Sequence, residues 1–544
     1  MMKQLFHNGV MVSKYEPKGF HILFRGKDIA LNPEQEEMAV AWVKKLGTDY
    51  VKDKVFARNF FDDFGVAMGI KEKISPEDID FSEIIKTVEK EKNDKLNMLK
   101  EERIKLARER KNIREANKEK YGYVVVDGER IEVSNYVVEP GSIFMGRGKH
   151  PLRGKWKEGA KEKDIIINLS PDSKVPEGEW KKIIWEPDFM WVAKWDDKLS
   201  GKEKYVWLSD TSKVKQERER EKFDKANELK KEYDKVKKHI VDNLVSEDFK
   251  RRKTATVCYL IDALSMRVGD EKDEDEADTV GATTLTKDNV IIEDNNLVKF
   301  EFLGKDSVRW EKEIVLPDQV VKNLKEFISN SESKIFDGVR SENVKLFLNE
   351  VVQGLTAKVF RTFHASKAVD DYFKKTDVKK EYYDDYKKYF ATMANLQATI
   401  VCNHKRTLPK SWKQTLDKKI ENLKLTRGKI SDKRIKSIQV LESRIEQLKA
   451  MKQTKNRKLK LNDYKSKLKI LKSRKMTEKE EEYIKKLELK IEIMKETKYY
   501  NLSTSLKSYI DPRIYLEWSK KVDFDWKKYY PKTLQRKFSW IEKK

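Results

Sequence analysis

Cysteine is nearly absent from this chain of 544 residues, which contains only Cys258 and Cys402. Two thiols cannot form a disulfide framework, and their scarcity is typical of a reducing compartment. His404 follows Cys402 by two positions, but the two cysteines and six histidines lack the paired spacing of a zinc site. Neither a P-loop nor an acidic metal cluster is recognised. The sequence therefore predicts a protein without a metal or another cofactor.

Long apolar runs are also absent. No stretch approaches the ~20 apolar residues that a membrane-spanning helix needs, and residues 1–7 do not resemble a signal peptide. We therefore expect an intracellular protein that is not secreted and has no membrane partner. The chain is long enough for two to four domains, each with its own core.

Acidic residues are too few to balance the basic ones. The chain has 118 lysines and arginines against 93 aspartates and glutamates, a net charge of +25. Such a surplus favours a polyanionic partner, and composition alone leaves DNA, RNA and an acidic membrane surface open. Residues 410–497 carry +15 of this surplus, with 28 basic and 13 acidic residues.

Helix breakers are almost missing from residues 410–497, which contain Gly428 and no proline. Apolar residues recur there at roughly heptad spacing, at Ile438, Leu441, Ile445, Leu448, Leu468 and Leu471. The pattern predicts an antiparallel coiled-coil hairpin with its turn near residues 454–457. A coiled coil that serves only as a spacer is an equally simple interpretation.

The remaining segments differ in their patterns. Residues 82–120 are almost all charged and contain no proline or glycine, which predicts one or two solvated helices. Between residues 121 and 208, short β-branched and aromatic runs separated by turn formers predict a compact sheet domain. Residues 216–409 have a mainly helical pattern, except for two strands that flank a turn at Lys305.

Five residues far apart in the sequence are suited to one chemistry: Arg267, Lys305, Arg361, His404 and Tyr509. Attack of a tyrosine oxygen on a DNA phosphodiester places negative charge on two non-bridging oxygens. Two guanidiniums and an imidazole N–H can neutralise that charge without a metal. A lysine ammonium can protonate the leaving oxygen of the broken strand. The tyrosine then holds the broken strand, so religation needs no ATP.

Each of these residues also has an ordinary structural interpretation. An arginine on a helix is most often a surface charge. Lys305 suits the cap of a turn after Gly304, and His404 suits a hydrogen-bonded position near a helix end. A lone tyrosine such as Tyr509 is usually a packing residue. The neighbouring strings decide between these interpretations.

Those strings resemble the active site of eukaryotic-type type IB DNA topoisomerases. They are residues 264–272, 277–281, 354–358, 402–406 and 504–513. The resemblance covers nearly the whole chain, from residues 15–17 to residues 533–538. It implies that Tyr509 is the nucleophile of a 3′-phosphotyrosine intermediate and that Lys305 is the general acid. Arg267, Arg361 and His404 are implied to stabilise the transition state.

The resemblance also implies a function and an architecture. The function is relaxation of positive and negative supercoils in double-stranded DNA by a monomer, through cleavage of one strand, controlled rotation and religation, without ATP or metal. The implied fold is α+β: a bilobed DNA clamp with a mixed α/β cap, a mainly helical catalytic lobe of the tyrosine recombinase kind, and a basic coiled-coil linker. The expected domains are 1–215 (cap, with charged helices at about 82–120), 216–409 (catalytic core), 410–497 (linker) and 498–544 (C-terminal domain with Tyr509). The implied location is the nucleus or another compartment that contains DNA.

Six further residues are implied to contact DNA: Arg147, Lys149, Asp306, Lys358, Thr504 and Ser508. Arg147 lies in a Gly-Arg-Gly loop, and in the family this arginine reaches the minor groove. A camptothecin-type inhibitor site is implied near Arg147, Asp306 and Ser508. The chain departs from the family at Met145, where arginine is usual, and at Ser508, where asparagine commonly precedes the tyrosine. The first change removes one DNA contact, and the second alters the implied drug site.

Two other functions stay open at this point. A tyrosine recombinase has the same five-residue chemistry, but it would assemble as a tetramer that exchanges strands. The match to the cap and the basic hairpin argue against it. His404 and Tyr509 are 105 positions apart and that hairpin fills most of the separation, whereas in poxvirus-like enzymes the tyrosine follows the histidine closely. A non-catalytic basic coiled-coil protein that coats nucleic acid fits the composition but leaves the five residues unexplained.

Overall fold

The computed structural model describes residues 2–146, 148–270, 280–304, 308–473 and 476–542. The fold is mixed α/β, in agreement with the expected class. Its elements divide into two units, each assembled from two pieces of the chain. Unit 1 comprises residues 1–222 and 269–337, and unit 2 comprises residues 223–268 and 338–544. Arg267, Arg361, His404 and Tyr509 all belong to unit 2.

An aromatic core between two helices stabilises the first part of unit 1. The helices are α1 (Pro33–Val43) and α2 (Lys54–Ala67). Asn32 begins α1, because its side chain accepts hydrogen bonds from the backbone N–H groups of Glu34 and Gln35. Trp42 of α1 stacks on Phe60 of α2, with 4.8 Å between the ring centroids. Each helix thus buries its apolar face in one cluster.

The strands of unit 1 form several small sheets. They are β1 (Leu5–His7), β2 (Met11–Val12), β3 (His21–Phe24), β4 (Lys27–Ala30), β5 (Ile79–Asp80), β6 (Tyr123–Val126), β7 (Glu129–Glu132), β8 (Val137–Val138), β9 (Ser142–Ile143), β10 (Trp156–Lys157), β11 (Ile166–Asn168), β12 (Lys182–Ile184), β13 (Trp191–Asp196), β14 (Glu203–Trp207), β15 (Val290–Ile292), β16 (Leu297–Gly304) and β17 (Val308–Val315). One sheet has the order β12-β11-β13-β14, and another has the order β15-β16-β17. The strands expected between residues 121 and 208 are confirmed, and their inward side chains share a core.

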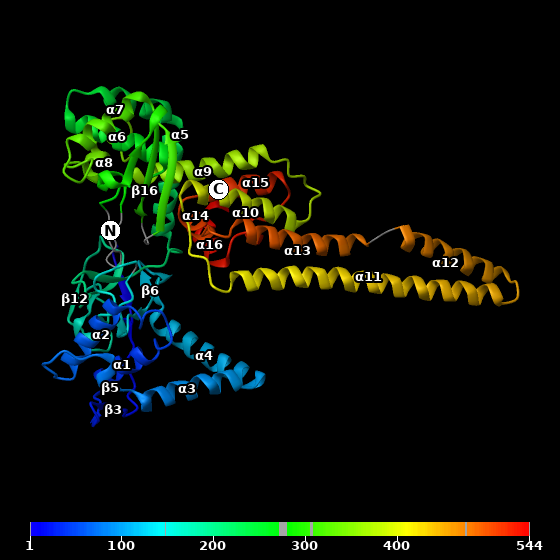
Figure 1. Cartoon of the computed structure of the whole chain (residues 1–544), viewed down its shortest axis with the longest axis horizontal. Coiled ribbons are helices and arrows are strands. Elements are labelled where there is room, and N and C mark those ends of the chain that lie inside the picture. The colour runs from blue at the N-terminus through cyan, green and yellow to red at the C-terminus, as the bar shows by residue number, and fades with distance from the viewer. Residues whose placement is uncertain (1, 147, 271–279, 305–307, 474–475, 543–544) are drawn as a thin grey trace. The chain divides into compact units, whose positions relative to one another are not determined.

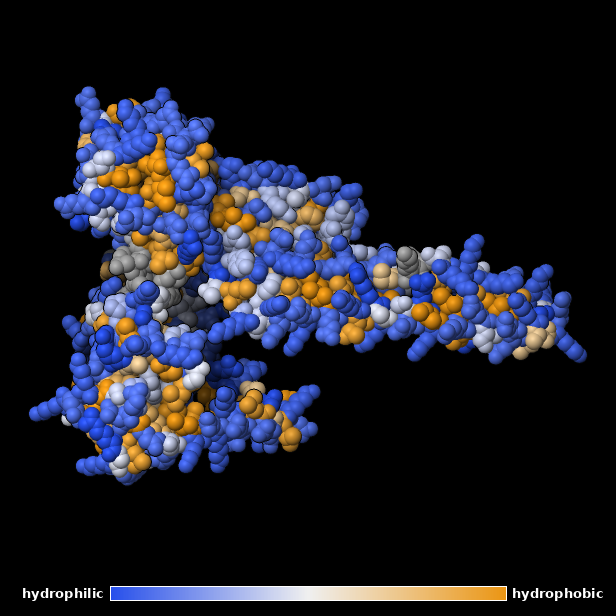
Figure 2. Space-filling view, in the orientation of Figure 1, coloured by the Kyte–Doolittle hydropathy of each residue, from blue (hydrophilic) through white to orange (hydrophobic). Residues whose placement is uncertain are grey.

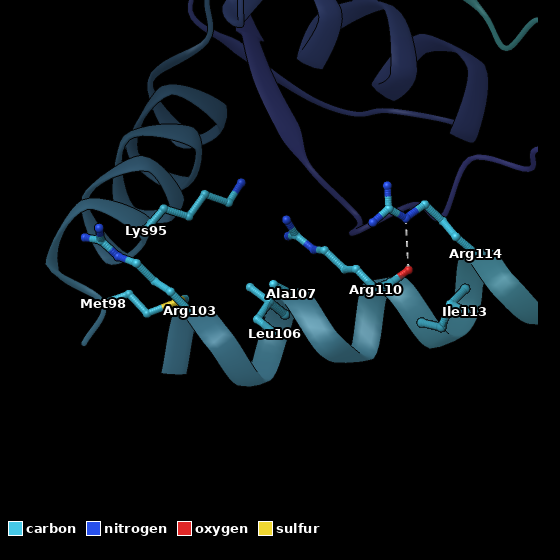
Figure 3. Close-up of a pocket in the computed structure, with 8 residues that line it drawn as sticks. All are labelled: Lys95, Met98, Arg103, Leu106, Ala107, Arg110, Ile113 and Arg114. Atoms are coloured by element: carbon cyan, nitrogen blue, oxygen red, sulfur yellow. Dashed lines mark hydrogen bonds between the residues drawn. The ribbon is translucent and has the colours of Figure 1, made fainter. Parts of the chain in front are cut away.

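The charged stretch at residues 82–120 forms two helices, as predicted: α3 (Ser82–Asn97) and α4 (Lys100–Tyr121). Ile84 is the single buried residue of α3, and α4 has none. A groove of about 670 Å³ lies along α4 (Figure 3). Its lining combines basic and apolar side chains: Lys95, Met98, Arg103, Leu106, Ala107, Arg110, Ile113 and Arg114. These helices therefore present both kinds of side chain to solvent.

Helices make up most of unit 2 (Figure 1). Helix α5 (Lys213–Asp242) runs from unit 1 into unit 2, and α7 (Asp318–Ser329) belongs to unit 1. Apart from the basic hairpin, the other helices of unit 2 are α6 (Phe249–Leu264), α8 (Ser341–Asn349), α9 (Ala357–Lys375), α10 (Asp384–Val401), α14 (Leu502–Ser508), α15 (Pro512–Lys521) and α16 (Lys532–Lys537). Phe373 of α9 stacks on Trp518 of α15, with 4.4 Å between the ring centroids. The C-terminal helices thus share one core with α9 and α10.

Three helices form the basic hairpin: α11 (Trp412–Ala450), α12 (Lys455–Ser473) and α13 (Glu478–Glu496). Helix α11 packs against both α12 and α13. Figure 2 shows apolar residues along the hairpin among hydrophilic ones, and Ile445 of α11 and Ile484 of α13 are buried. The break after α11 lies at residues 451–454, slightly before the predicted turn. Arg457 explains its position, because its Nη2 donates to the carbonyl of Lys449 at 2.8 Å and so caps the end of α11.

Within the described ranges, no helix is both long enough and apolar enough to cross a membrane.

Candidate active site

Arg361 connects the ends of two helices. It lies on α9 and is almost fully buried, with 4% of its surface exposed. Its Nη1 donates to the carbonyl of Ser265 at 3.3 Å, and its Nη2 donates to the carbonyl of Cys402 at 2.8 Å. These carbonyls follow the last residues of α6 and α10, where helices leave acceptors unpaired. Arg361 therefore stabilises the two segments that lead to Arg267 and His404.

His404 is held as a buried neutral imidazole. Asn403 precedes it with a φ of 52°, and this left-handed residue ends α10 and turns the chain. Burial and the positive charges of Arg361 and Arg267 lower the pKa of His404 from 6.5 to about 3. The Nε2 atom of His404 lies 3.3 Å from Nη2 of Arg361, and its Nδ1 lies 2.7 Å from Oγ of Ser505.

Tyr509 lies against both of these residues. Its ring centroid is 5.0 Å from that of His404 and 5.1 Å from Cζ of Arg361. The tyrosine directly follows α14, and its backbone N–H donates to the carbonyl of Ser505 at 2.9 Å. Ser366 of α9 fixes the next turn, because its hydroxyl donates to the carbonyl of Tyr509 and accepts from the N–H of Asp511.

Backbone hydrogen bonds join residues 404–406, which include His404, to residues 499–501, which precede Tyr509. The N–H of Asn501 donates to the carbonyl of His404 at 2.8 Å, and the N–H of Arg406 donates to the carbonyl of Tyr499 at 2.8 Å. Lys405 and Tyr500 form an antiparallel bridge between these contacts. His404 and Tyr509, which are 105 positions apart, are therefore connected through a hairpin whose two ends are side by side.

The Asp-Pro-Arg run after Tyr509 has a structural role. Asp511 caps α15 by accepting from the N–H of Arg513, and Pro512 occupies the first turn, where no N–H is needed. Arg513 forms ion pairs with Asp511 at 2.7 Å and Asp224 at 2.6 Å, which raise its pKa against the effect of burial. The motif that marks the tyrosine in the sequence thus anchors the turn that carries it.

Not every predicted site residue can be placed. Arg267 is half-buried, three positions after the end of α6, and its charge acts on His404. Lys305 lies outside the described residues, although β16 and β17 are paired as expected up to Gly304 and Val308. Arg147 and Asp306 also lie outside the described residues. The implied inhibitor site depends on both of them, so it stays a prediction.

The other residues expected to contact DNA are partly accessible. Lys149 is exposed in a turn of unit 1. Lys358 is exposed on α9, one turn before Arg361. Thr504 and Ser508 lie four positions apart on α14, so they share a face of that helix, and both are half-buried.

Sequence reasoning missed the residues behind His404. Ser505, Thr399 and Asn395 are buried polar side chains linked by hydrogen bonds. A weak signal for them existed, because Asn395 and Thr399 are one helical turn apart in a stretch of α10 that contains no charged residue. In the described part of the chain, no group of three or more His, Cys, Asp or Glu side chains is arranged to hold a metal ion.

Comparison with known proteins identifies the family. Residues 2–208 match the model of the eukaryotic DNA topoisomerase I DNA binding fragment, and residues 211–438 match the model of its catalytic core. Residues 481–544 match a C-terminal topoisomerase domain. DNA topoisomerase 1 of Homo sapiens is 32% identical over 556 residues, which cover 99% of this chain and 70% of the human protein. The chain belongs to the eukaryotic DNA topoisomerase I family.

Other members of the topoisomerase I family match over a similar range. DNA topoisomerase 1 beta of Arabidopsis thaliana is 34% identical over 99% of this chain and 58% of its own length. DNA topoisomerase 1 of Drosophila melanogaster is 34% identical over 98% of this chain and 53% of its own length. The chain thus spans little more than half the length of these two curated relatives. The family assignment favours the topoisomerase interpretation over a tyrosine recombinase.

Proposed function

We propose that this protein is a type IB DNA topoisomerase that relaxes positive and negative supercoils without ATP or metal. The observation that carries the proposal is the contact of the Tyr509 ring with both Arg361 and His404. A nucleophile, a buried guanidinium and a neutral imidazole meet there, and Arg267 adds a second positive charge. These are the groups that a metal-free attack on a phosphodiester requires.

The reaction follows from the chemistry of these groups. The Tyr509 oxygen attacks phosphorus and its proton passes to water, while the bond from phosphorus to the 5′-oxygen breaks. Arg267 and Arg361 neutralise the non-bridging oxygens, and His404 donates a hydrogen bond to one of them. Lys305, assigned by its resemblance to the family, protonates the 5′-oxygen. The 3′-phosphotyrosine conserves the bond energy, and the same steps in reverse reseal the strand.

The architecture expected from the resemblance belongs to the same proposal. Residues 1–215 and 216–409 act as the two lobes of a clamp around duplex DNA, with Arg147, Lys149, Asp306, Lys358, Thr504 and Ser508 at the DNA surface. Residues 410–497 act as a coiled-coil linker that restrains rotation, and residues 498–544 supply Tyr509. The protein acts as a monomer, in the nucleus or another compartment with DNA. A camptothecin-type inhibitor would bind near Arg147, Asp306 and Ser508.

Plasmid relaxation in EDTA and without nucleotide tests the function. The unmodified chain is expected to relax supercoils of either sign, and Tyr509→Phe is expected to bind DNA but leave supercoils and strands intact. Tyr499→Phe is the matched control, because Tyr499 is an exposed tyrosine of the same segment and should retain activity. An absolute requirement for Mg²⁺ or ATP would overturn the proposal, as would full activity of Tyr509→Phe.

A further inference from the structure

A chain of hydrogen bonds runs from Arg361 through His404 into the core of unit 2. Nη2 of Arg361 lies 3.3 Å from Nε2 of His404, and Nδ1 of His404 lies 2.7 Å from Oγ of Ser505. Oγ of Ser505 lies 3.0 Å from Oγ1 of Thr399, which lies 2.8 Å from the carbonyl oxygen of Asn395. Ser505 and Thr399 are fully buried, so water does not compete for their hydroxyl groups.

The chemistry of Arg361 fixes the direction of the hydrogen bonds at His404. Arginine has no acceptor, so Nε2 of His404 must accept from Arg361. The imidazole is neutral, so its single proton is on Nδ1, which donates to Ser505. The Thr399 hydroxyl has a single proton and lies within hydrogen-bond distance of both the carbonyl oxygen of Asn395 and Oγ of Ser505. When that proton is on the Asn395 side, Ser505 donates to Thr399. Each of the four contacts then contains one proton.

The proposed reaction requires the opposite arrangement at His404. To donate to a phosphate oxygen, Nε2 must carry the proton, and Nδ1 must then accept. Among the residues that the structure describes, the Ser505 hydroxyl is the group within hydrogen-bond distance of Nδ1, so it would turn to donate to the ring. Thr399 would turn to donate to Ser505. The carbonyl of Asn395 would still be paired with the backbone N–H of Thr399, because both are inside α10.

We propose that Ser505, backed by Thr399, is a positioning residue that holds His404 through Nδ1 in both of its neutral tautomers. In the DNA-free protein Nε2 accepts from Arg361, and in the DNA complex Nε2 donates to the phosphate. The two states contain the same number of protons, and they differ in the rotation of two hydroxyl groups and in exchange of the imidazole proton with water. The second state rests on the proposed function, whereas the first follows from the structure alone.

A buried hydroxyl is suited to this role because it both donates and accepts. An alanine at Ser505 would remove the hydroxyl that pairs with Nδ1 in both tautomers. A purely structural role for Ser505 would be filling the gap between α10 and α14. If Ser505 positions His404, the effect of Ser505→Ala on the cleavage rate requires the imidazole to be present. If Ser505 only fills space, the effect is the same without the imidazole.

The tautomer of His404 can be read directly by ¹⁵N NMR of protein labelled at its six histidines. His404→Gln identifies the His404 signals. In the free protein we expect the proton on Nδ1, and a proton on Nε2 would overturn the first state. In Tyr509→Phe bound to duplex DNA, which cannot be cleaved, we expect the proton on Nε2. A proton that stays on Nδ1 in that complex would overturn the exchange.

Single-turnover cleavage separates positioning from packing. Ser505→Ala is expected to slow cleavage by about 10- to 100-fold, as is usual when the partner that orients a functional histidine is lost. In a His404→Gln background the same change should alter the rate less than about twofold, because the amide N–H of glutamine donates without a tautomer. Equal losses in both backgrounds would show that Ser505 only packs.

A second pair of variants makes the test independent of folding defects at Ser505. Thr399→Ser keeps the hydroxyl and should retain the cleavage rate, whereas the nearly isosteric Thr399→Val removes it and should slow cleavage. Equal rates for the two variants would overturn the role of Thr399. If the unmodified chain cleaves no DNA at all, the proposed function fails, while the NMR result for the free protein still decides the first state.

Discussion

The guanidinium of Arg361 lies over the ring of Tyr509, with 5.1 Å between Cζ and the ring centroid. A cation over the face of a tyrosine ring is attracted to its π electrons, and the attraction grows when the oxygen becomes negative. The same guanidinium is anchored by the carbonyls of Ser265 and Cys402. Arg361 is therefore placed to act on the nucleophile and also to stabilise the fold around it.

Arg361→Ala should consequently lower both stability and activity. We expect a loss of about 1–3 kcal/mol in unfolding free energy, because two buried carbonyls lose their donor. Cleavage should slow by about 100-fold or more, because a charge that stabilises the transition state is removed. Urea denaturation and single-turnover cleavage measure the two effects. Unchanged stability together with slow cleavage would show that the carbonyl contacts contribute little.

Lys305→Ala tests the proton donor. A substrate whose 5′-bridging oxygen is replaced by sulfur has a good leaving group that needs little protonation. This substrate should restore cleavage by Lys305→Ala but not by Arg267→Ala, since the arginine stabilises charge on other oxygens. Cleavage rates with the oxygen and sulfur substrates give the comparison. Equal rescue of both variants, or of neither, would require a different proton donor.

The acidic side of the pH profile should be independent of His404. Its pKa is lowered to about 3, so the imidazole stays neutral throughout the range from pH 5 to pH 8. Cleavage rates of the unmodified chain and of His404→Gln should therefore differ by a constant factor across this range. An inflection near pH 6.5 that disappears in His404→Gln would contradict the neutral, buried histidine.

His7 should make the stability of unit 1 depend on pH. Its Nε2 donates to the carbonyl of Asn168 at 2.8 Å, and its Nδ1 accepts from the N–H of Gly9 at 3.0 Å. Burial lowers the pKa of His7 from 6.5 to about 4, although the bond to Asn168 opposes the shift. The unfolded chain therefore binds a proton more readily than the folded one.

The stabilisation from neutral His7 is thus complete above pH 6.5 and is lost as the pH falls towards 4. The lowering of the pKa of His7 from 6.5 to about 4 corresponds to roughly 3 kcal/mol. His7→Gln, whose side chain does not titrate, should weaken the pH dependence of unfolding between pH 6.5 and pH 4. Urea denaturation of both proteins at several pH values measures the difference, and parallel pH profiles would contradict the prediction.

The local structure could largely be predicted from the sequence where a pattern depends on nearby residues. The charged, uninterrupted stretches became α3, α4 and the helices of the hairpin, and the alternating runs around Lys305 became β16 and β17. The break after α11 was expected a few residues too late, because its position depends on Arg457 reaching back to Lys449. A side-chain cap of this kind cannot be recognised from the spacing of apolar residues in the sequence.

The contacts behind the site could not be predicted, since they join residues that no local pattern connects. Ser505 meets His404 only because residues 404–406 pair with residues 499–501. The division into units is similar: residues 269–337 belong with the N-terminal part, although they interrupt unit 2 in the sequence. Long-range packing decides both features.

The paired ends of the hairpin also bear on the order in which the protein folds. Arg406 donates to the carbonyls of Thr497 and Lys498, more than ninety positions away, and a flexible loop of that length makes such a contact slow to form. Helices α11, α12 and α13 can form from local contacts first, and their pairing brings the two ends of the hairpin together. Once the hairpin has formed, Arg406 is already close to Thr497 and Lys498, so their contact no longer requires closure of a long flexible loop. Destabilising the hairpin far from Tyr509 should therefore delay assembly of the active site during refolding without changing any residue in it.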